Sequence, residues 1–130
     1  MNLALRLSIV ILCSLFTSHL LSFEIFGNKW IGAKTTIYSD IPGRSASGIP
    51  WDIAFSQAAA EWNEKTDFKF NVVSEYRNPC LTDGLNGVAF VADMCGESFG
   101  KFALAVTALR YQSQLLGPAA IIEADIFINA

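Results

Sequence analysis

The sequence predicts an α+β domain in which one amphipathic helix packs on a mixed, twisted sheet of five strands. Two observations predict this class. Apolar residues recur at helical spacing in one segment and at every second position in the next, and clusters of turn-forming residues separate the remaining apolar runs. The chain of 130 residues is 52% hydrophobic and 16% charged, which is the composition of one small domain with a core.

Residues 1–22 have the order of a secretory signal peptide. Arg6 precedes an apolar run, residues 7–16, and small and polar residues follow. A transmembrane helix needs roughly 20 continuous apolar residues, and polar residues interrupt this run too early for one. We therefore expect cleavage after Ser22, a secreted or periplasmic domain over residues 23–130, and no membrane association after cleavage. An uncleaved anchor is the alternative.

The charge of the mature chain argues against two classes of partner. Without the leader, eight basic residues stand against twelve acidic ones, a net charge of about −4. Such a balance argues against nucleic acid and against an anionic membrane surface. His19 is the one histidine of the sequence and belongs to the leader, so the mature domain has no imidazole group.

The mature chain keeps two cysteines, Cys80 and Cys95. An exported protein meets an oxidising compartment, so an even count of cysteines favours a disulfide. Closing a loop of about 15 residues stabilises a fold by around 3 kcal/mol in the chain-entropy model. A metal site or a redox pair is the alternative, but two cysteines alone are a poor metal site and a redox pair is more often C-x-x-C.

The first half of the mature chain predicts a strand, a loop and a helix. Residues 34–38 are β-branched and aromatic, which is typical of a short strand, and residues 39–50 are rich in Gly, Pro and Ser. The helix is predicted over residues 50–66, with Pro50 at its first position and an acidic residue in its first turn. We expect its apolar stripe to lie in the core. The stripe consists of Trp51, Ala54, Phe55, Ala58 and Trp62.

The second half of the mature chain predicts four further strands. Polar and apolar residues alternate over residues 68–73, as in a half-buried strand. Turn residues in segment 78–87 separate this strand from one at residues 88–92, and strands at 103–109 and 121–129 follow. One helix covers only part of one face of such a sheet, and mixed sheets usually need a second layer.

Four short strings follow one another in an order that is typical of a known family. They are a first strand led by Trp30, the helical string AAAEWN at residues 58–63, LAVT at residues 104–107 and ADIFIN at residues 124–129. Together they resemble the N-terminal half of matrixin-type secreted zinc metallopeptidases of the metzincin group. The NPC and CG segments around the two cysteines look like a bacterial branch of that family. The resemblance spans nearly all of the mature chain.

The resemblance implies a twisted five-stranded sheet and two large helices, the second of which carries the zinc-binding motif H-E-x-x-H-x-x-G-x-x-H. In this motif two histidines four apart share a helix face, the glutamate acts as general base on zinc-bound water, and the glycine turns the chain toward a third histidine. The complete family member is thereby implied to be a zinc-dependent metalloendopeptidase. In such proteins the zinc-binding helix follows the strand that matches residues 124–129.

This sequence departs from the family pattern at that motif, because no H-E-x-x-H string occurs in it and the mature chain has no histidine. We therefore expect a member truncated before the zinc-binding helix, with no catalytic residue, no metal ligand and no activity of its own. The alternative is a non-catalytic secreted binding module that recruits peptides or a partner through an exposed rim strand. A third possibility is a product that does not fold stably.

The rim strand carries the substrate contacts that the resemblance implies. In the family the strand that matches residues 102–107 forms the upper rim of the cleft and takes an extended peptide or protein substrate by strand addition. Leu104, Ala105 and Val106 are the residues expected to bind it, and the small side chain of Ala105 lets a peptide backbone approach. The alternative is that these are ordinary strand residues.

Two carboxylates stand near the end of the sequence. Glu123 and Asp125 are two apart on a predicted strand and so share a face, which would suit paired carboxylates or calcium. No third acidic residue stands beside them, so we expect a solvated strand face instead. Asp83 precedes Gly84, and this pair is expected to form a turn.

Overall fold

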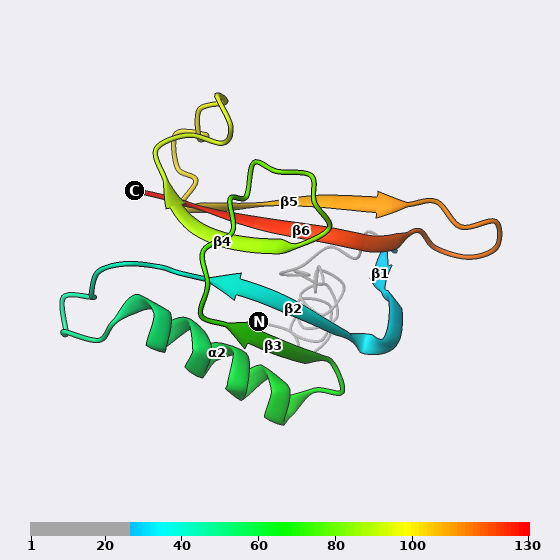
Figure 1. Ribbon diagram of the computed structural model, residues 1–130, viewed down its shortest axis with the longest axis horizontal. Coiled ribbons are helices and arrows are strands. Elements are labelled where there is room, and N and C mark those ends of the chain that lie inside the picture. The colour runs from blue at the N-terminus through cyan, green and yellow to red at the C-terminus, as the bar shows by residue number, and fades with distance from the viewer. Residues whose placement is uncertain (1–26) are drawn as a thin grey trace, which may run out of the picture.

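The computed structural model describes residues 27–130, and the signal peptide predicted for residues 1–22 lies outside the described residues. The described part contains one α-helix, a short 3-10 turn and six strands (Figure 1). They are β1 (Lys29–Trp30), η1 (Ile31–Ala33), β2 (Lys34–Ser39), α2 (Trp51–Lys65), β3 (Lys69–Val73), β4 (Asn86–Val91), β5 (Ala105–Gln112) and β6 (Ala120–Asn129). In this part of the chain no helix is both long enough and apolar enough to cross a bilayer.

The six strands form one mostly parallel sheet. The strand order is β1-β6-β4-β2-β3, and all four of these pairings are parallel. β5 pairs with β6 in the antiparallel direction along nearly the whole of β6. The predicted mixed sheet with one helix is therefore confirmed. The sixth strand is β1, which lies outside the five predicted strands and which η1 separates from β2.

The helix begins one residue later than predicted. Pro50 has extended backbone angles, with φ −61° and ψ 139°, so it caps the helix and Trp51 is the first helical residue. The helix ends where the backbone N–H of Thr66 donates to the carbonyl of Trp62 at 3.0 Å. Next to this end, the side chain of Asn63 exchanges two hydrogen bonds with the backbone of Phe70 and so ties the helix to β3.

The hydrophobic core lies between α2 and the sheet. Ile37 of β2 and Val88 of β4 are buried together with Ile41, and Phe55 of α2 packs against them. The partly buried residues around this centre are Phe70, Phe90, Ile126 and Ile128. Figure 1 shows α2 beside β3 and β2, whereas β6 and β5 lie toward the opposite edge of the sheet.

The prediction that both helix tryptophans lie in the core is wrong. Trp51 is 38% exposed and Trp62 is 52% exposed. Each packs edge-to-face on one phenylalanine of the sheet, Trp51 on Phe90 and Trp62 on Phe70. β3 is the strand that lies closest along α2, so the outer surfaces of both rings stay open to solvent.

β5 begins two residues later and ends three residues later than predicted. Ala103 belongs to a turn, because its backbone N–H donates to the carbonyl of Gly100 at 2.8 Å. Pairing with β6 continues through a bulge between Arg110 and Tyr111. The extra residue of this bulge is Ile122 of β6, because Arg110 lies opposite Glu123 and Tyr111 lies opposite Ile121. β5 itself continues regularly beyond the apolar run from which it was predicted, through Arg110, Tyr111 and Gln112.

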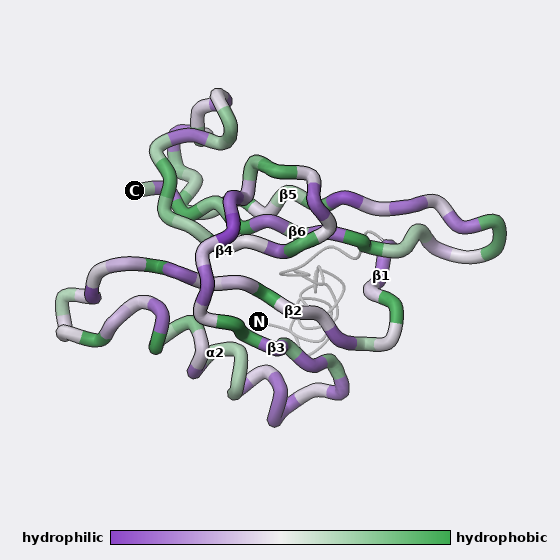
Figure 2. The backbone as a smooth tube through the Cα atoms, viewed as in Figure 1, coloured by the Kyte–Doolittle hydropathy of each residue, from purple (hydrophilic) through white to green (hydrophobic). Residues whose placement is uncertain are grey.

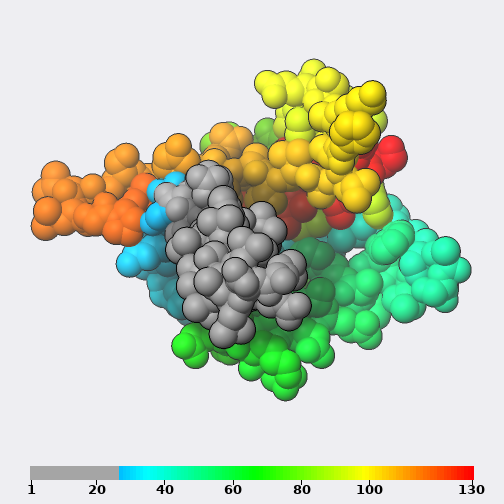
Figure 3. Space-filling model, turned by 180° about the vertical axis from the view of Figure 1, so that it is seen from behind, coloured from blue at the N-terminus to red at the C-terminus, as the bar shows by residue number. Residues whose placement is uncertain are grey.

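Two segments project from the sheet. In the view from behind (Figure 3), the turn between β5 and β6 extends beyond one side, and the loop between β4 and β5 rises above another. The residues at the tip of the β5–β6 turn are coloured as hydrophobic in Figure 2. This turn contains Leu115, which is 99% exposed. The second segment contains Cys95, whose partner is described below.

Candidate functional site

β5 is an edge strand of the described sheet. It pairs with β6 and with no other described strand. In the register of this pair, Ala105 lies opposite Ile128 and Thr107 lies opposite Ile126. The edge of β5 that faces away from β6 therefore lies at the border of the described sheet (Figure 1).

The register decides which backbone groups of β5 are free. The backbone N–H of Asn129 donates to the carbonyl of Leu104 at 2.9 Å, so this pair is a hydrogen-bonded one. In an antiparallel ladder, hydrogen-bonded and non-hydrogen-bonded pairs alternate. The N–H and C=O groups of Ala105, Thr107 and Leu109 therefore point away from β6 and toward the outer edge.

The three predicted substrate-binding residues lie together at the start of β5 but differ in what they offer. Leu104 is 83% exposed and precedes the strand, and its carbonyl is already bonded to Asn129. Ala105 turns its backbone groups outward. Val106 lies opposite Phe127, and the alternation directs its backbone groups toward β6. Of the three, Ala105 is the residue whose backbone can bind an added strand.

Two apolar hollows lie on the face of the sheet that carries α2. Their volumes are about 250 and 270 Å³. Side chains of residues directly opposite each other in a sheet share a face. Ala105 lies opposite Ile128 and Thr107 lies opposite Ile126, so all four side chains point to the face that carries α2. The lining of the hollows includes Phe55, Trp62 and Ile126 in the first and Trp51, Phe90 and Ile128 in the second.

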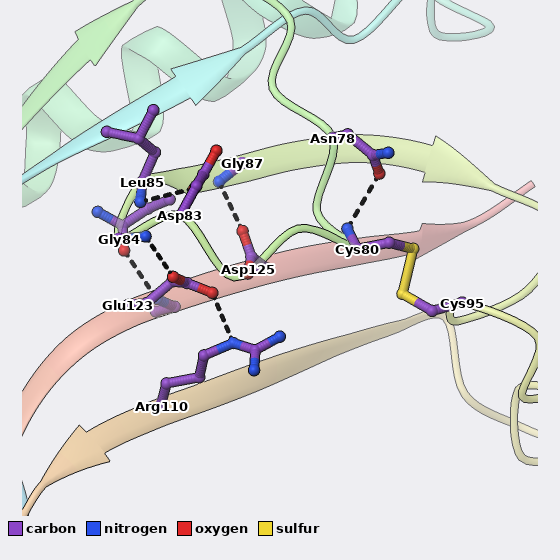
Figure 4. A network of polar contacts seen from close by, with 12 residues as sticks. Asn78, Cys80, Asp83, Gly84, Leu85, Gly87, Cys95, Arg110, Glu123 and Asp125 are labelled. Atoms are coloured by element: carbon purple, nitrogen blue, oxygen red, sulfur yellow. Dashed lines mark hydrogen bonds and ion pairs between the residues drawn. A yellow bond between two sulfur atoms is a disulfide. The ribbon is translucent and has the colours of Figure 1, made fainter.

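The opposite face of β6 holds two buried carboxylates. Glu123 is 1% exposed and Asp125 is 2% exposed, so the prediction of a solvated strand face is wrong. The backbone N–H of Gly84 donates to Oε2 of Glu123 at 2.6 Å, and that of Gly87 donates to Oδ1 of Asp125 at 2.9 Å (Figure 4). The two carboxylates thus hold the segment that leads into β4 against β6.

One cation accompanies this pair of carboxylates. Nε of Arg110, on β5, lies 2.6 Å from Oε1 of Glu123. Neither of these two atoms makes a directed hydrogen bond, so the contact is ionic. Oδ2 of Asp125 is buried and has no hydrogen-bond partner among the described residues.

The environment of Asp125 raises the pKa of its carboxyl group to about 6. Burial is the largest cause, because it disfavours the charged form. The hydrogen bond from Gly87 opposes this rise, whereas the negative charge of Glu123 adds to it. Asp125 therefore holds a proton more readily than an exposed aspartate does.

The described residues do not fit the zinc ion that the family resemblance implies. Residues 27–130 contain no histidine and no group of three or more His, Cys, Asp or Glu side chains that could hold a metal ion. Catalytic zinc sites use three protein ligands, most often with histidine among them. The carboxylates of Glu123 and Asp125 are occupied by backbone N–H groups and by Arg110.

The predicted disulfide between Cys80 and Cys95 is confirmed, with Cα atoms 5.5 Å apart. It links the segment before β4 to the loop after β4 (Figure 4). Asp83 accepts a hydrogen bond from the backbone N–H of Leu85 at 2.9 Å, which confirms its turn-forming role. Asp93 acts in the same way, because it accepts from the N–H of Gly96 at 2.7 Å.

Sequence reasoning missed the burial of the two carboxylates. Their spacing placed both side chains on one face, but their partners come from positions 38 and 39 residues earlier. No local sequence pattern predicts partners that are so far away in the chain. The one available signal was Arg110, the one basic residue between the predicted strands at residues 103–109 and 121–129.

Comparisons of the chain with protein-family profiles, with curated proteins and with solved structures found no match.

Proposed function

We propose that this chain is the sheet-and-first-helix part of a secreted, matrixin-type zinc metalloendopeptidase, in which β5 receives an extended peptide by strand addition. One observation carries this proposal: among residues 27–130 nothing pairs with the outer edge of β5, and Ala105, Thr107 and Leu109 turn their backbone groups toward it. The chain itself contains no H-E-x-x-H motif. We therefore expect it to bind peptides without cleaving them.

Strand addition suits this edge for energetic reasons. Three residues with outward N–H and C=O groups offer one donor and one acceptor each, and a typical hydrogen bond contributes about 0.5–1.5 kcal/mol net. The edge from Ala105 to Leu109 contains no proline and no charged side chain, the features that usually block added strands.

The buried carboxylates have no part in this proposal. Glu123 and Asp125 lie on the face opposite the hollows and are closed off from solvent. A general acid or base must come within about 3 Å of the proton that it transfers. Neither carboxylate can approach a peptide bound along β5.

The test uses Thr107→Pro, with Thr107→Ala as its matched control. Proline removes the outward N–H of Thr107 and leaves the hydrogen bonds to β6 intact, and proline is tolerated where a strand N–H faces solvent. An array of overlapping unstructured decapeptides first identifies a ligand for residues 23–130. We then expect Thr107→Pro to weaken binding of that decapeptide at least about tenfold, which corresponds to about 1.4 kcal/mol.

The control decides how the result is interpreted. Thr107→Ala removes the side chain but keeps the N–H, so the affinity is expected to stay within about twofold. Circular dichroism of both variants checks that they fold. If folded Thr107→Pro binds the decapeptide as tightly as the unmodified chain does, β5 is not the binding edge.

A second candidate function is a non-catalytic secreted binding module that uses the same edge. The observation in its favour is that, among the described residues, β5 has a free outer edge and no group of three or more His, Cys, Asp or Glu side chains could hold a metal ion. The two functions differ in the gene rather than in the peptide affinity. Sequencing the transcript beyond the codon for Ala130 distinguishes them, since an in-frame H-E-x-x-H motif supports the peptidase and its absence over the next hundred or so codons supports the module.

A further inference from the structure

The charges around β6 do not balance when every group is ionised. Glu123 and Asp125 supply two negative charges in a site that is almost fully buried, and Arg110 supplies one positive charge. A buried net charge carries a large desolvation penalty. One proton added to the two carboxylates makes the cluster neutral.

The hydrogen bonds leave one carboxylate oxygen free to carry this proton. Three of the four carboxylate oxygens are engaged: Oε2 of Glu123 by Gly84, Oε1 of Glu123 by Arg110, and Oδ1 of Asp125 by Gly87. Oδ2 of Asp125 is the remaining oxygen, and it is buried without a partner. A proton on Oδ2 turns this orphaned acceptor into a donor beside a carboxylate.

Within the part of the chain that the structure describes, Arg110 is the cation that acts on this pair. From β5, Arg110 is the cation that faces them, and the residue opposite Asp125 is Ala108. From the segment before β4, Arg77 directs its guanidinium over the ring of Tyr38 and pairs with Glu75. Asp83 is engaged with the backbone of Leu85.

We propose that Glu123 and Asp125 share one proton, and that this protonated pair is a pH-sensitive clamp that fastens the segment leading into β4, Gly84 to Gly87, onto β6. The clamp is closed when the proton is present. When the proton leaves, two neighbouring buried carboxylates repel each other and the hold on the segment weakens. This inference does not depend on the proposed peptide binding.

The sign of the pH effect follows from proton binding. The pKa of Asp125 is raised from 3.8 to about 6 in the folded protein, so the folded state binds the proton more tightly than the unfolded state does. The stabilisation is complete below about pH 4 and is lost as the pH rises through about 6. Two pKa units correspond to a change of about 100-fold in the unfolding equilibrium constant.

The first experiment compares the unmodified chain with Asp125→Asn by urea unfolding between pH 4 and pH 8. Asparagine is neutral at every pH, can accept from Gly87 and can donate to Glu123, so it mimics the protonated clamp. The unfolding constant of the unmodified chain, divided by that of Asp125→Asn, is expected to rise by about 100-fold across this range. A constant ratio, or an Asp125→Asn variant that is less stable at pH 8, would overturn the proposal.

A second measurement does not require the variant to fold. The backbone amides of Gly84 and Gly87 donate to the two carboxylates, so their NMR chemical shifts report the titration. For a shared proton both amides follow the same midpoint near pH 6. Two separate midpoints below pH 4.5 would show two independently ionised carboxylates and contradict the clamp.

Glu123→Gln tests the charge balance itself. This variant leaves one carboxylate beside Arg110, so Asp125 can ionise without creating a net buried charge. The midpoint at Gly87 is expected to fall below that of the unmodified chain, whereas Glu64→Gln, an exposed control on α2, leaves it in place. An unchanged midpoint in Glu123→Gln would show that the two carboxylates do not share the proton.

Discussion

At the scale of single residues, Gly87 is where the contacts of the buried cluster meet. Its N–H donates to Asp125, and a Cβ atom at this position would lie 2.7 Å from the backbone carbonyl oxygen of Arg77. The requirement for glycine is therefore one of space. The next residue toward the N-terminus, Asn86, donates to the carbonyl of Thr36 and accepts from the N–H of Ala124. Asn86 thereby joins the two strands that flank the start of β4.

We expect Gly87→Ala to destabilise the domain by about 1–3 kcal/mol, because the added methyl group pushes against backbone that cannot move freely. The control is Gly100→Ala, where the nearest atom to a Cβ is 4.0 Å away. Urea unfolding of both variants measures the difference. Equal stability of the two variants would show that the approach of Arg77 to Gly87 is not a tight contact.

At the residue scale, the start of β4 differs from the prediction for a physical reason. The segment 78–87 is rich in turn-forming residues and was expected to be a turn throughout. β4 instead begins at Asn86, because the side-chain amide of Asn86 satisfies backbone groups of two neighbouring strands. A local propensity for turns was overridden by partners 38 and 50 residues away.

At the scale of elements, the disulfide joins the segments on either side of β4. Cys80 lies between β3 and β4, and Cys95 lies between β4 and β5. We expect the double variant Cys80→Ser/Cys95→Ser to lose around 3 kcal/mol of stability, because the bond closes a loop with a sequence separation of 15 residues. Urea unfolding measures this loss.

Chemical reduction of the unmodified chain provides an independent control for the disulfide. The reduced chain should match the double variant in its unfolding midpoint, since both lack the same cross-link. A midpoint that does not move on reduction would mean that the segments are held in place by other contacts.

The elements were predictable where one pattern dominated. The helix has an apolar stripe at regular spacing, and its observed bounds, Trp51–Lys65, differ from the prediction by one residue at each end. The end of β5 was not predictable, because its last three residues, Arg110, Tyr111 and Gln112, are not part of an apolar run and are held in the strand by pairing with β6. β1 has two residues, which is too short for any periodicity.

At the scale of the whole molecule, the two faces of the sheet have different roles. The face with α2 holds the apolar core and two hollows, and the opposite face holds the buried carboxylates. β5 contributes to both faces, since Thr107 points to the first and Arg110 contacts Glu123 on the second. The mixed sheet could be predicted from the order of the elements, and the edge position of β5 was implied by the family resemblance alone. The carboxylate cluster depends on the tertiary structure and could not.

The central claim is that the outer edge of β5 accepts an added strand, and amide hydrogen exchange measured by NMR tests it most directly. Adding the selected decapeptide should slow exchange at Ala105, Thr107 and Leu109 and leave Val106 and Ala108 unchanged, because the latter two amides face β6. Binding without this alternating protection, or protection at residues outside β5 alone, would contradict the claim.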